Sequence, residues 1–305
     1  MIELLTHTLP HGITLSCRAA GAAGRPVLMF LHGFPEAAFV WDDVLTHFAQ
    51  LENGGFRCIA PNLRGYENSS APPDVAAYRP KHLVQDLAAL IALEGGQLEC
   101  LVAHDWGGAV AWNLAASHPG LMNKLAIINS PHPGTFLREL KHSPAQQAAS
   151  AYMNFLIRPD AEALLAESDF RRLWEFFDQW AAGTPPAWLT PAVKDRYRAV
   201  WSRGLTGPLN FYRASPLRPP RPGPPHNDPA AANVTIERAM LEVHLPTLVL
   251  WAMNDTALPP ALLDGLADFV PRMQLVRLEG ASHWVLHEHP ERVIGELQAF
   301  IESAH

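Results

Sequence analysis

The sequence predicts an α/β fold, with a mostly parallel sheet flanked by helices and with an inserted helical cap. Short apolar runs alternate with helix-like segments in both terminal parts of the chain, which is the pattern of a parallel sheet covered on both faces. The alternation stops between about residues 133 and 232, where aromatic residues and helix formers dominate. We therefore expect residues 1–132 and 232–305 to form the sheet domain and residues 133–231 to form the cap.

Each expected element follows from its local pattern. Two extended segments around His11-Gly12, residues 3–9 and 13–18, predict a hairpin at one edge of the sheet. Short apolar runs predict the other strands, at residues 27–31, 58–61, 98–103, 125–129, 247–251 and 274–278. Helices are expected at residues 40–51, 81–93, 106–117, 260–269 and 290–302. A proline-dense stretch, residues 216–229, is too irregular for helix or strand and is the expected return path from the cap.

Composition excludes several classes of partner. The formal net charge is −7 and no basic run is present, so neither nucleic acid nor an anionic membrane surface is an expected partner. The first residues lack the pattern of a signal peptide, and no stretch approaches the ~20 apolar residues that span a bilayer. Cys17, Cys58 and Cys100 are isolated, which predicts buried free thiols and a cytoplasmic protein.

The segment Ala103-His104-Asp105-Trp106-Gly107-Gly108 joins an apolar run to a helix-like run. Small residues two places before and two places after Asp105 allow the tight turn of a nucleophile elbow, which holds one side chain clear of the backbone. The usual occupant of such a turn is Ser, whereas this chain has Asp. A carboxylate can displace a leaving group at saturated carbon and form an ester that water then cleaves. Asp105 is therefore the expected nucleophile, although Asp at a helix start also serves as an N-cap.

Two other polar residues follow expected strands near the end of the chain. Asp255 comes shortly after the run 247–251, and His283 comes shortly after the run 274–278. Active sites of open parallel sheets collect at the carboxyl ends of strands. Asp105, Asp255 and His283 are therefore expected to meet there, in the chain order nucleophile, acid, histidine.

The loop His32-Gly33-Phe34-Pro35 also follows an expected strand. The backbone N–H groups of Phe34 and Trp106 are the expected oxyanion hole, and the bond before Pro35 is a candidate cis peptide. His283, His287 and His289 superficially resemble a metal-ligand spacing. Since His287 and His289 stand just before a helix start, we expect surface or capping roles for both and no metal.

Five motifs together resemble the α/β-hydrolase-fold epoxide hydrolases of the soluble type. They are His32-Gly33-Phe34-Pro35, Arg64-Gly65-Tyr66, His104-Asp105-Trp106-Gly107-Gly108, Asn129-Ser130-Pro131-His132-Pro133 and Gly280-Ala281-Ser282-His283. The resemblance covers nearly the whole chain. It implies an α/β-hydrolase fold and the hydrolysis of a small-molecule epoxide to a vicinal diol, through an ester on Asp105 cleaved by water that His283 and Asp255 activate. It implies neither a cofactor nor a metal.

The resemblance also implies two cap tyrosines that bind the epoxide oxygen. Tyr152 matches one of them, because Pro159 follows seven residues later with Ala161-Glu162 beyond it. Tyr212 matches the other, within Leu209-Asn210-Phe211-Tyr212-Arg213. By composition alone, both would be packing residues of an aromatic cap. Together with Phe34 and Trp106, they are the expected substrate-binding residues.

Two other functions compete with this one. A haloalkane or haloacid dehalogenase would use the same Asp nucleophile, and Trp106 fits a halide-binding role. Phe34, however, stands where haloalkane dehalogenases often have Asn. Fluoroacetate dehalogenases carry arginines at the positions of Trp106 and Ala109, so a haloacid would lack its charge clamp here. A non-catalytic binding protein on the same fold should have lost a member of the catalytic set, and none is lost.

Overall fold

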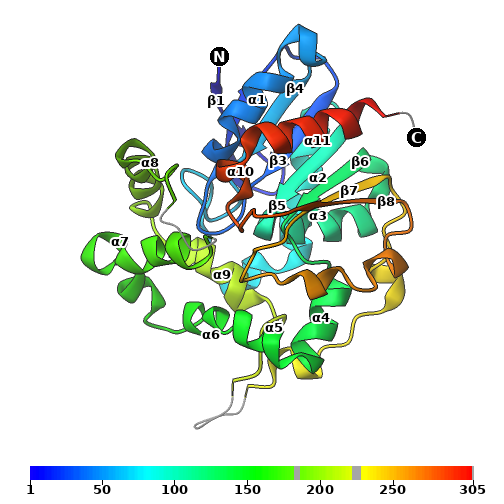
Figure 1. Ribbon diagram of the computed structural model, residues 1–305. Helices are drawn as coiled ribbons and strands as arrows, with labels where there is room; N and C mark the ends of the chain where they lie inside the picture. The colour runs from blue at the N-terminus through cyan, green and yellow to red at the C-terminus, as the bar shows by residue number, and fades with distance from the viewer. Residues whose placement is uncertain (182–185, 222–227, 304–305) are drawn as a thin grey trace.

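A computed structural model of the protein describes residues 1–181, 186–221 and 228–303. An eight-stranded sheet with the order β1-β2-β4-β3-β5-β6-β7-β8 lies at its centre (Figure 1). The strands are β1 (Glu3–Thr8), β2 (Thr14–Ala20), β3 (Val27–Leu31), β4 (Arg57–Pro61), β5 (Leu98–His104), β6 (Met122–Ile128), β7 (Thr247–Ala252) and β8 (Met273–Leu278). β2 pairs antiparallel with β1 and β4, and the other pairs are parallel. The mostly parallel sheet and its edge hairpin are thereby confirmed.

Helices cover both faces of the sheet because successive side chains of a strand point to opposite faces. In β3, Leu28 and Phe30 pack into the cluster that includes α1 (Asp42–Phe48) and α11 (Pro290–Glu302). Met29 and Leu31 pack into the cluster that includes α2 (Pro80–Leu93) and α3 (Asp105–Ser117). These buried strands read as continuous apolar runs, as strands covered on both sides must.

A helical insertion joins β6 to β7 and lies at the carboxyl end of the parallel strands (Figure 1). Its helices are α4 (Pro133–His142), α5 (Pro144–Ala149), α6 (Tyr152–Leu156), α7 (Ala161–Gln179), α8 (Pro191–Trp201) and α9 (Thr206–Ala214). The start of the proline-dense stretch, residues 216–221, has neither helix nor regular strand, while residues 222–227 of that stretch lie outside the described residues. The insertion covers the edge of the sheet at which the parallel strands end.

Two expected helices differ from the structure. The prediction of a helix over residues 260–269 is wrong, because Pro260–Leu263 and Leu266–Asp268 are separate 3-10 turns. Gly265 between them has φ 68°, a left-handed conformation that interrupts any helix. The helix expected over residues 40–51 is shorter, since only Asp42–Phe48 is α-helical and a 3-10 turn, Ala38–Trp41, precedes it.

Two smaller expectations, on the cysteines and on the bond before Pro35, are met. Cys17, Cys58 and Cys100 are buried free thiols, and the Phe34-Pro35 bond is cis. Within the described residues, no helix is long and apolar enough to cross a membrane. That same part of the chain contains no group of His, Cys, Asp and Glu side chains arranged to hold a metal ion.

Candidate active site

Asp105 stands at the turn between β5 and α3 with φ 48°, a backbone conformation that residues other than glycine rarely adopt. Glycines on both sides make this turn possible. A Cβ at Gly33 would lie 2.2 Å from Asp105 Oδ1, and a Cβ at Gly107 would lie 2.6 Å from the His32 carbonyl oxygen. A Cβ at Gly108 would lie 2.3 Å from Ser130. The motif glycines are therefore required by close packing around the elbow.

The two carboxylate oxygens of Asp105 have different surroundings. The backbone N–H of Phe34 donates a hydrogen bond of 2.7 Å to Oδ1. Oδ2 lies 3.8 Å from His283 Nε2, and that nitrogen has no hydrogen-bond partner among the described residues. The Ser130 hydroxyl donates to the backbone carbonyl of Asp105 (2.6 Å) and holds the turn itself. One carboxylate oxygen is thus fixed by an amide, while the other lies beside the imidazole.

His283 and Asp255 form a buried pair at the ends of the last two strands. His283 Nδ1 lies 2.6 Å from Asp255 Oδ2, and both side chains are almost fully buried. Asp255 is itself held by the N–H groups of Ala257 and Leu258 on Oδ1, at 2.9 and 2.8 Å. Asn129 Nδ2 donates to the same Oδ2 that contacts His283 (2.8 Å). The carboxylate therefore orients the imidazole with its Nε2 toward Asp105.

The charges around His283 shift its proton affinity upward. Burial favours the neutral imidazole, but the nearby carboxylates of Asp255, Asp105 and Glu36 together outweigh it and raise the pKa of His283 to about 9. At neutral pH the resting imidazole is consequently protonated, and it forms a charged cluster with Asp255 and Asp105.

The structure brings both cap tyrosines over this cluster. Tyr152 begins α6 and Tyr212 lies in α9, and their ring centroids are 6.2 Å apart. Burial, followed by the negative charge of Asp105, raises the pKa of the Tyr152 phenol above its usual value. Burial likewise raises the pKa of Tyr212. Both phenols therefore keep their protons at neutral pH and can act as hydrogen-bond donors.

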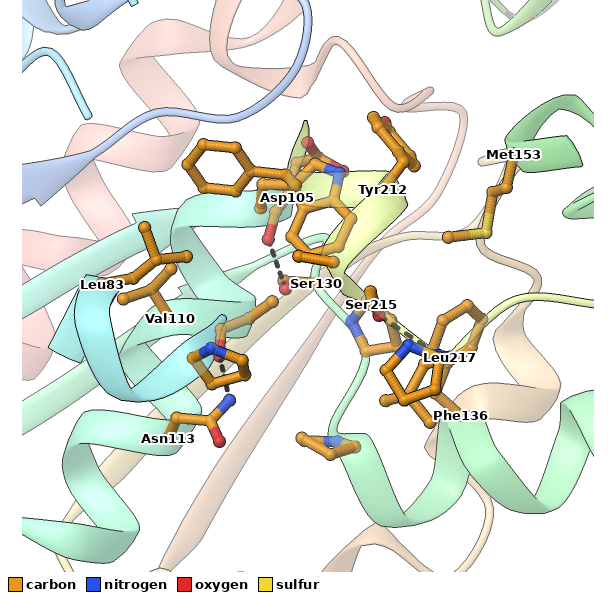
Figure 2. Close-up of a pocket in the computed structure, with 18 of the residues that line it drawn as sticks. Leu83, Asp105, Val110, Asn113, Ser130, Phe136, Met153, Tyr212, Ser215 and Leu217 are labelled. Carbon is orange, nitrogen blue, oxygen red and sulfur yellow. Dashed lines mark hydrogen bonds between the residues drawn. The ribbon is translucent and has the colours of Figure 1, made fainter. Parts of the chain in front are cut away.

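Trp106 follows Asp105 directly and forms part of the cavity wall. Its ring packs edge-on against Phe211 (5.6 Å) and Tyr212 (5.0 Å). A cavity of about 220 Å³ opens here, and Asp105, Trp106, Tyr152 and Tyr212 all line it. Figure 2 shows Asp105 and Tyr212 at this cavity. The role of the Trp106 N–H as a second oxyanion donor remains a prediction, whereas the Phe34 N–H already holds Asp105.

Sequence reasoning missed a buried polar network behind His283. The Glu36 carboxylate is 1% exposed and accepts hydrogen bonds from Tyr197 Oη (2.8 Å) and His287 Nε2 (2.7 Å). His104 Nδ1 lies 3.4 Å from Glu36, and its Nε2–H donates to the backbone carbonyl of His283 (3.1 Å). Burial opposes ionisation of Glu36, yet these histidines keep its pKa well below the usual value.

The surroundings of Glu36 show that the expected position of His287 was wrong. His287 was expected at the surface or as a cap, but its ring contacts Glu36 and stacks on Trp188 at 4.0 Å, because the cap closes over it. His289 is exposed and stands at the first position before α11, as expected. His104 is a buried neighbour of the elbow, also as expected. One feature of the sequence could have indicated this network. Glu36 is the one Asp, Glu, Lys or Arg within the mostly apolar residues 27–41.

Replacing Glu36 by Gln should move the pH dependence of His283. Because the Glu36 charge helps to raise the pKa of His283, its loss should lower that pKa and shift the acidic limb of the hydrolysis rate toward lower pH. Single-turnover rates measured across pH check this, with the exposed Glu52→Gln as control. An unchanged profile with an intact fold would contradict the coupling.

Comparison with known proteins assigns the family. A family model described as the alpha/beta hydrolase fold matches residues 26–290. The chain belongs to this family. This chain is 34% identical to the AB hydrolase superfamily protein YfhM of Bacillus subtilis over 283 residues, which are 92% of this chain and 91% of that protein. It is 32% identical to epoxide hydrolase 3 of Mus musculus over 96% of this chain and 75% of that protein.

Solved structures agree with this assignment. A structure from a study of novel epoxide hydrolases in metagenomes from hot environments matches our α/β-hydrolase fold protein with a TM-score of 0.86 at 36% identity, covering 100% of both chains. An α/β-hydrolase fold that resembles epoxide hydrolases along its whole length is thereby confirmed.

Proposed function

We propose that this protein hydrolyses an epoxide to a vicinal diol through a covalent ester on Asp105. The observation that carries the proposal is that the phenols of Tyr152 and Tyr212 line the same cavity as a carboxylate nucleophile. An opening oxirane develops negative charge on an oxygen that stays attached to the substrate, and Tyr152 and Tyr212 can donate protons to that oxygen. Similarity to epoxide hydrolases over the whole chain supports the proposal.

In the first step, Asp105 Oδ2 forms a bond to one oxirane carbon. The bond between that carbon and the ring oxygen breaks, and its electron pair moves to the oxygen. Tyr152 or Tyr212 donates its phenolic proton to this oxygen, a contribution typically worth about 10²–10⁴ in rate for a positioned general acid. Oδ1, which accepts from the Phe34 N–H, becomes the carbonyl oxygen of the ester.

In the second step, water cleaves the ester. His283 Nε2 takes a proton from the water as its oxygen attacks Cγ of Asp105, and the negative charge passes to Oδ1 at the Phe34 N–H. Asp255 holds the imidazole and stabilises its protonated form. Collapse of the tetrahedral intermediate expels the alkoxide oxygen, which takes the proton of the newly added hydroxyl and leaves as the diol. The Asp105 carboxylate is restored beside the protonated His283, and the phenolate regains its proton from solvent.

Esterification changes the basicity of His283 when it is needed. In the resting protein, the charge of Asp105 contributes to the raised pKa of His283, about 9. The ester carries no charge, so this contribution disappears and the imidazole releases its proton more readily. Loss of the Asp105 charge therefore lowers the pKa of His283 before the hydrolytic step, which needs a base, whereas the ring-opening step does not.

Dehalogenation is the competing use of the same nucleophile. A halide leaves as a stable anion and needs N–H donors rather than a proton donor. The Phe34 side chain offers no such donor, because a phenyl ring carries no N–H group. Its ring packs edge-on against Tyr212 (5.2 Å) and Phe176 (6.1 Å). The two phenols favour an oxygen leaving group instead.

Assays of diol and halide release on one preparation test the proposal. We expect diol from styrene oxide, and no halide from a chloroalkane or from chloroacetate. Tyr212→Phe should lower kcat for styrene oxide by about 100-fold, because one of the two proton donors is lost. Tyr78→Phe is the matched control, as Tyr78 lines the same cavity but is influenced by Arg64 and Asp86 rather than by Asp105. Halide without diol would overturn the proposal.

A further inference from the structure

An arm of the cavity extends from Asp105 along α3. It passes Val110 and reaches Asn113 (Figure 2), and Ala109 also lines it. Side chains of α2, α4 and the segment after α9 complete this arm, and they include Leu83, Phe136 and Leu217. The nucleophile therefore stands at the start of this arm.

The arm is apolar and uncharged. Among the described residues that line the cavity, Asp105 is the only charged side chain. Two of its polar side chains already have partners: Asn113 Nδ2 donates to the Ala109 carbonyl (2.7 Å), and Ser215 Oγ accepts from the Leu217 N–H (3.1 Å). The neutral Tyr78 hydroxyl also lines the cavity and has no hydrogen-bond partner among the described residues. A group bound in this arm would be held by apolar contact, because ionic recognition has no partner there.

The opposite side of Asp105 is closed by packed aromatic rings. Trp180 lies between Tyr152 (4.8 Å between centroids) and His283 (5.3 Å), and it packs on Phe176 at 5.0 Å. Phe176 in turn contacts Phe34. Phe34, Phe176 and Trp180 are all buried, and none of them lines the cavity. We call these three residues the aromatic wall.

Reaction geometry turns this asymmetry into a substrate requirement. Displacement at an oxirane carbon aligns the Asp105 oxygen, the attacked carbon and the leaving oxygen, which must also reach the two phenols. The substituents of the two ring carbons then extend sideways, one toward the arm and one toward the aromatic wall. Among the described residues, the arm offers room for a substituent, whereas the aromatic wall is buried and lines no part of the cavity.

We propose that the substrates are terminal oxiranes with a single apolar, uncharged substituent, which lies in the arm along α3. Oxiranes with bulk on both ring carbons are excluded by the aromatic wall. This inference rests on the proposed epoxide hydrolysis, and it names the substrate class of that site.

Two isomers of epoxyoctane test the inference, one with the ring at the chain end and one trans isomer with the ring in the middle. Their composition is the same, so hydrophobicity does not separate them. The unaltered protein should show kcat/KM at least about 100-fold higher for the terminal isomer, since a well-packed pocket rejects excess bulk by factors of this size. Equal values for the two isomers would overturn the inference and leave epoxide hydrolysis intact. Failure with every oxirane would overturn the proposed function itself.

Two variants locate the effect on opposite sides of Asp105. Trp180→Ala should raise the internal-to-terminal ratio of kcat/KM at least about 10-fold by opening the aromatic wall. Trp174→Ala, which removes a tryptophan within α7 that contacts Phe177 and Trp201 instead, should leave this ratio unchanged. Val110→Trp should fill the arm. It should lower the kcat/KM for terminal epoxyoctane relative to the kcat/KM for propylene oxide by about 10-fold. A constant ratio in a folded Val110→Trp protein would contradict the placement of the substituent, whatever the result with Trp180.

Discussion

Asp105→Asn is expected to reduce diol formation by at least about 10⁴-fold, because the amide is a very poor nucleophile at carbon. The substitution preserves shape, and its carbonyl oxygen can still accept the Phe34 N–H bond that Oδ1 accepts now. The elbow should therefore stay folded while the chemistry stops. Diol release from an apolar terminal oxirane, followed by chromatography, measures the loss.

The exposed Asp264→Asn is the control for this substitution, since it removes the same charge far from the cavity. Circular dichroism and thermal unfolding of both variants should match those of the unaltered protein. A folded Asp105→Asn protein that still turns over at a comparable rate would exclude the ester route, and direct attack by water would then have to replace it.

His283→Gln is expected to separate the two chemical steps. Ring opening needs Asp105 and a phenol but no base, whereas ester hydrolysis needs the imidazole that lies 3.8 Å from Asp105 Oδ2. Steady-state turnover should fall by about 10²–10⁴-fold, the usual range for loss of a general base. The ester should then accumulate, and the protein should gain the full mass of one oxirane, because the addition expels nothing.

Mass spectrometry of an acid-quenched reaction should place this added mass on the peptide that contains Asp105. His289→Gln, at an exposed position six residues further along, should turn over normally and carry no adduct. In the unaltered protein, a single turnover in heavy-oxygen water should put the label into the Asp105 carboxylate and not into the diol. No adduct on His283→Gln with any oxirane, or label appearing directly in the diol, would contradict the two-step mechanism.

Much of the site was predictable because its residues follow strands. Apolar runs mark where β5, β7 and β8 end, and the structure brings Asp105, Asp255 and His283 together there, with 2.6 Å between His283 and Asp255. Tyr152 and Tyr212 were found through motifs in the cap rather than through any periodicity. That they share a cavity with Asp105 follows from the way the cap packs on the sheet.

Other features left no local pattern. A glycine in an apolar stretch is compatible with a helix, so only the left-handed backbone of Gly265 shows that residues 260–269 break into two turns. The side chains that contact Glu36 come from three distant segments: His104 beside the elbow, Tyr197 in the cap and His287 near the C-terminus. Such partners meet only after the chain has folded, and a spacing in the sequence does not encode them.

The sequence by itself determined the alternating sheet, the elbow with Asp105, and the choice of Asp255 and His283 as its partners. Each of these follows from a pattern of neighbouring residues and from the order in which the strands end. Tertiary packing alone decided which side of Asp105 is open. Trp180 and Phe176 close one side, and the arm along α3 stays free on the other. The reason is that the shape of a pocket depends on how side chains from separate segments fill space, which no single segment specifies.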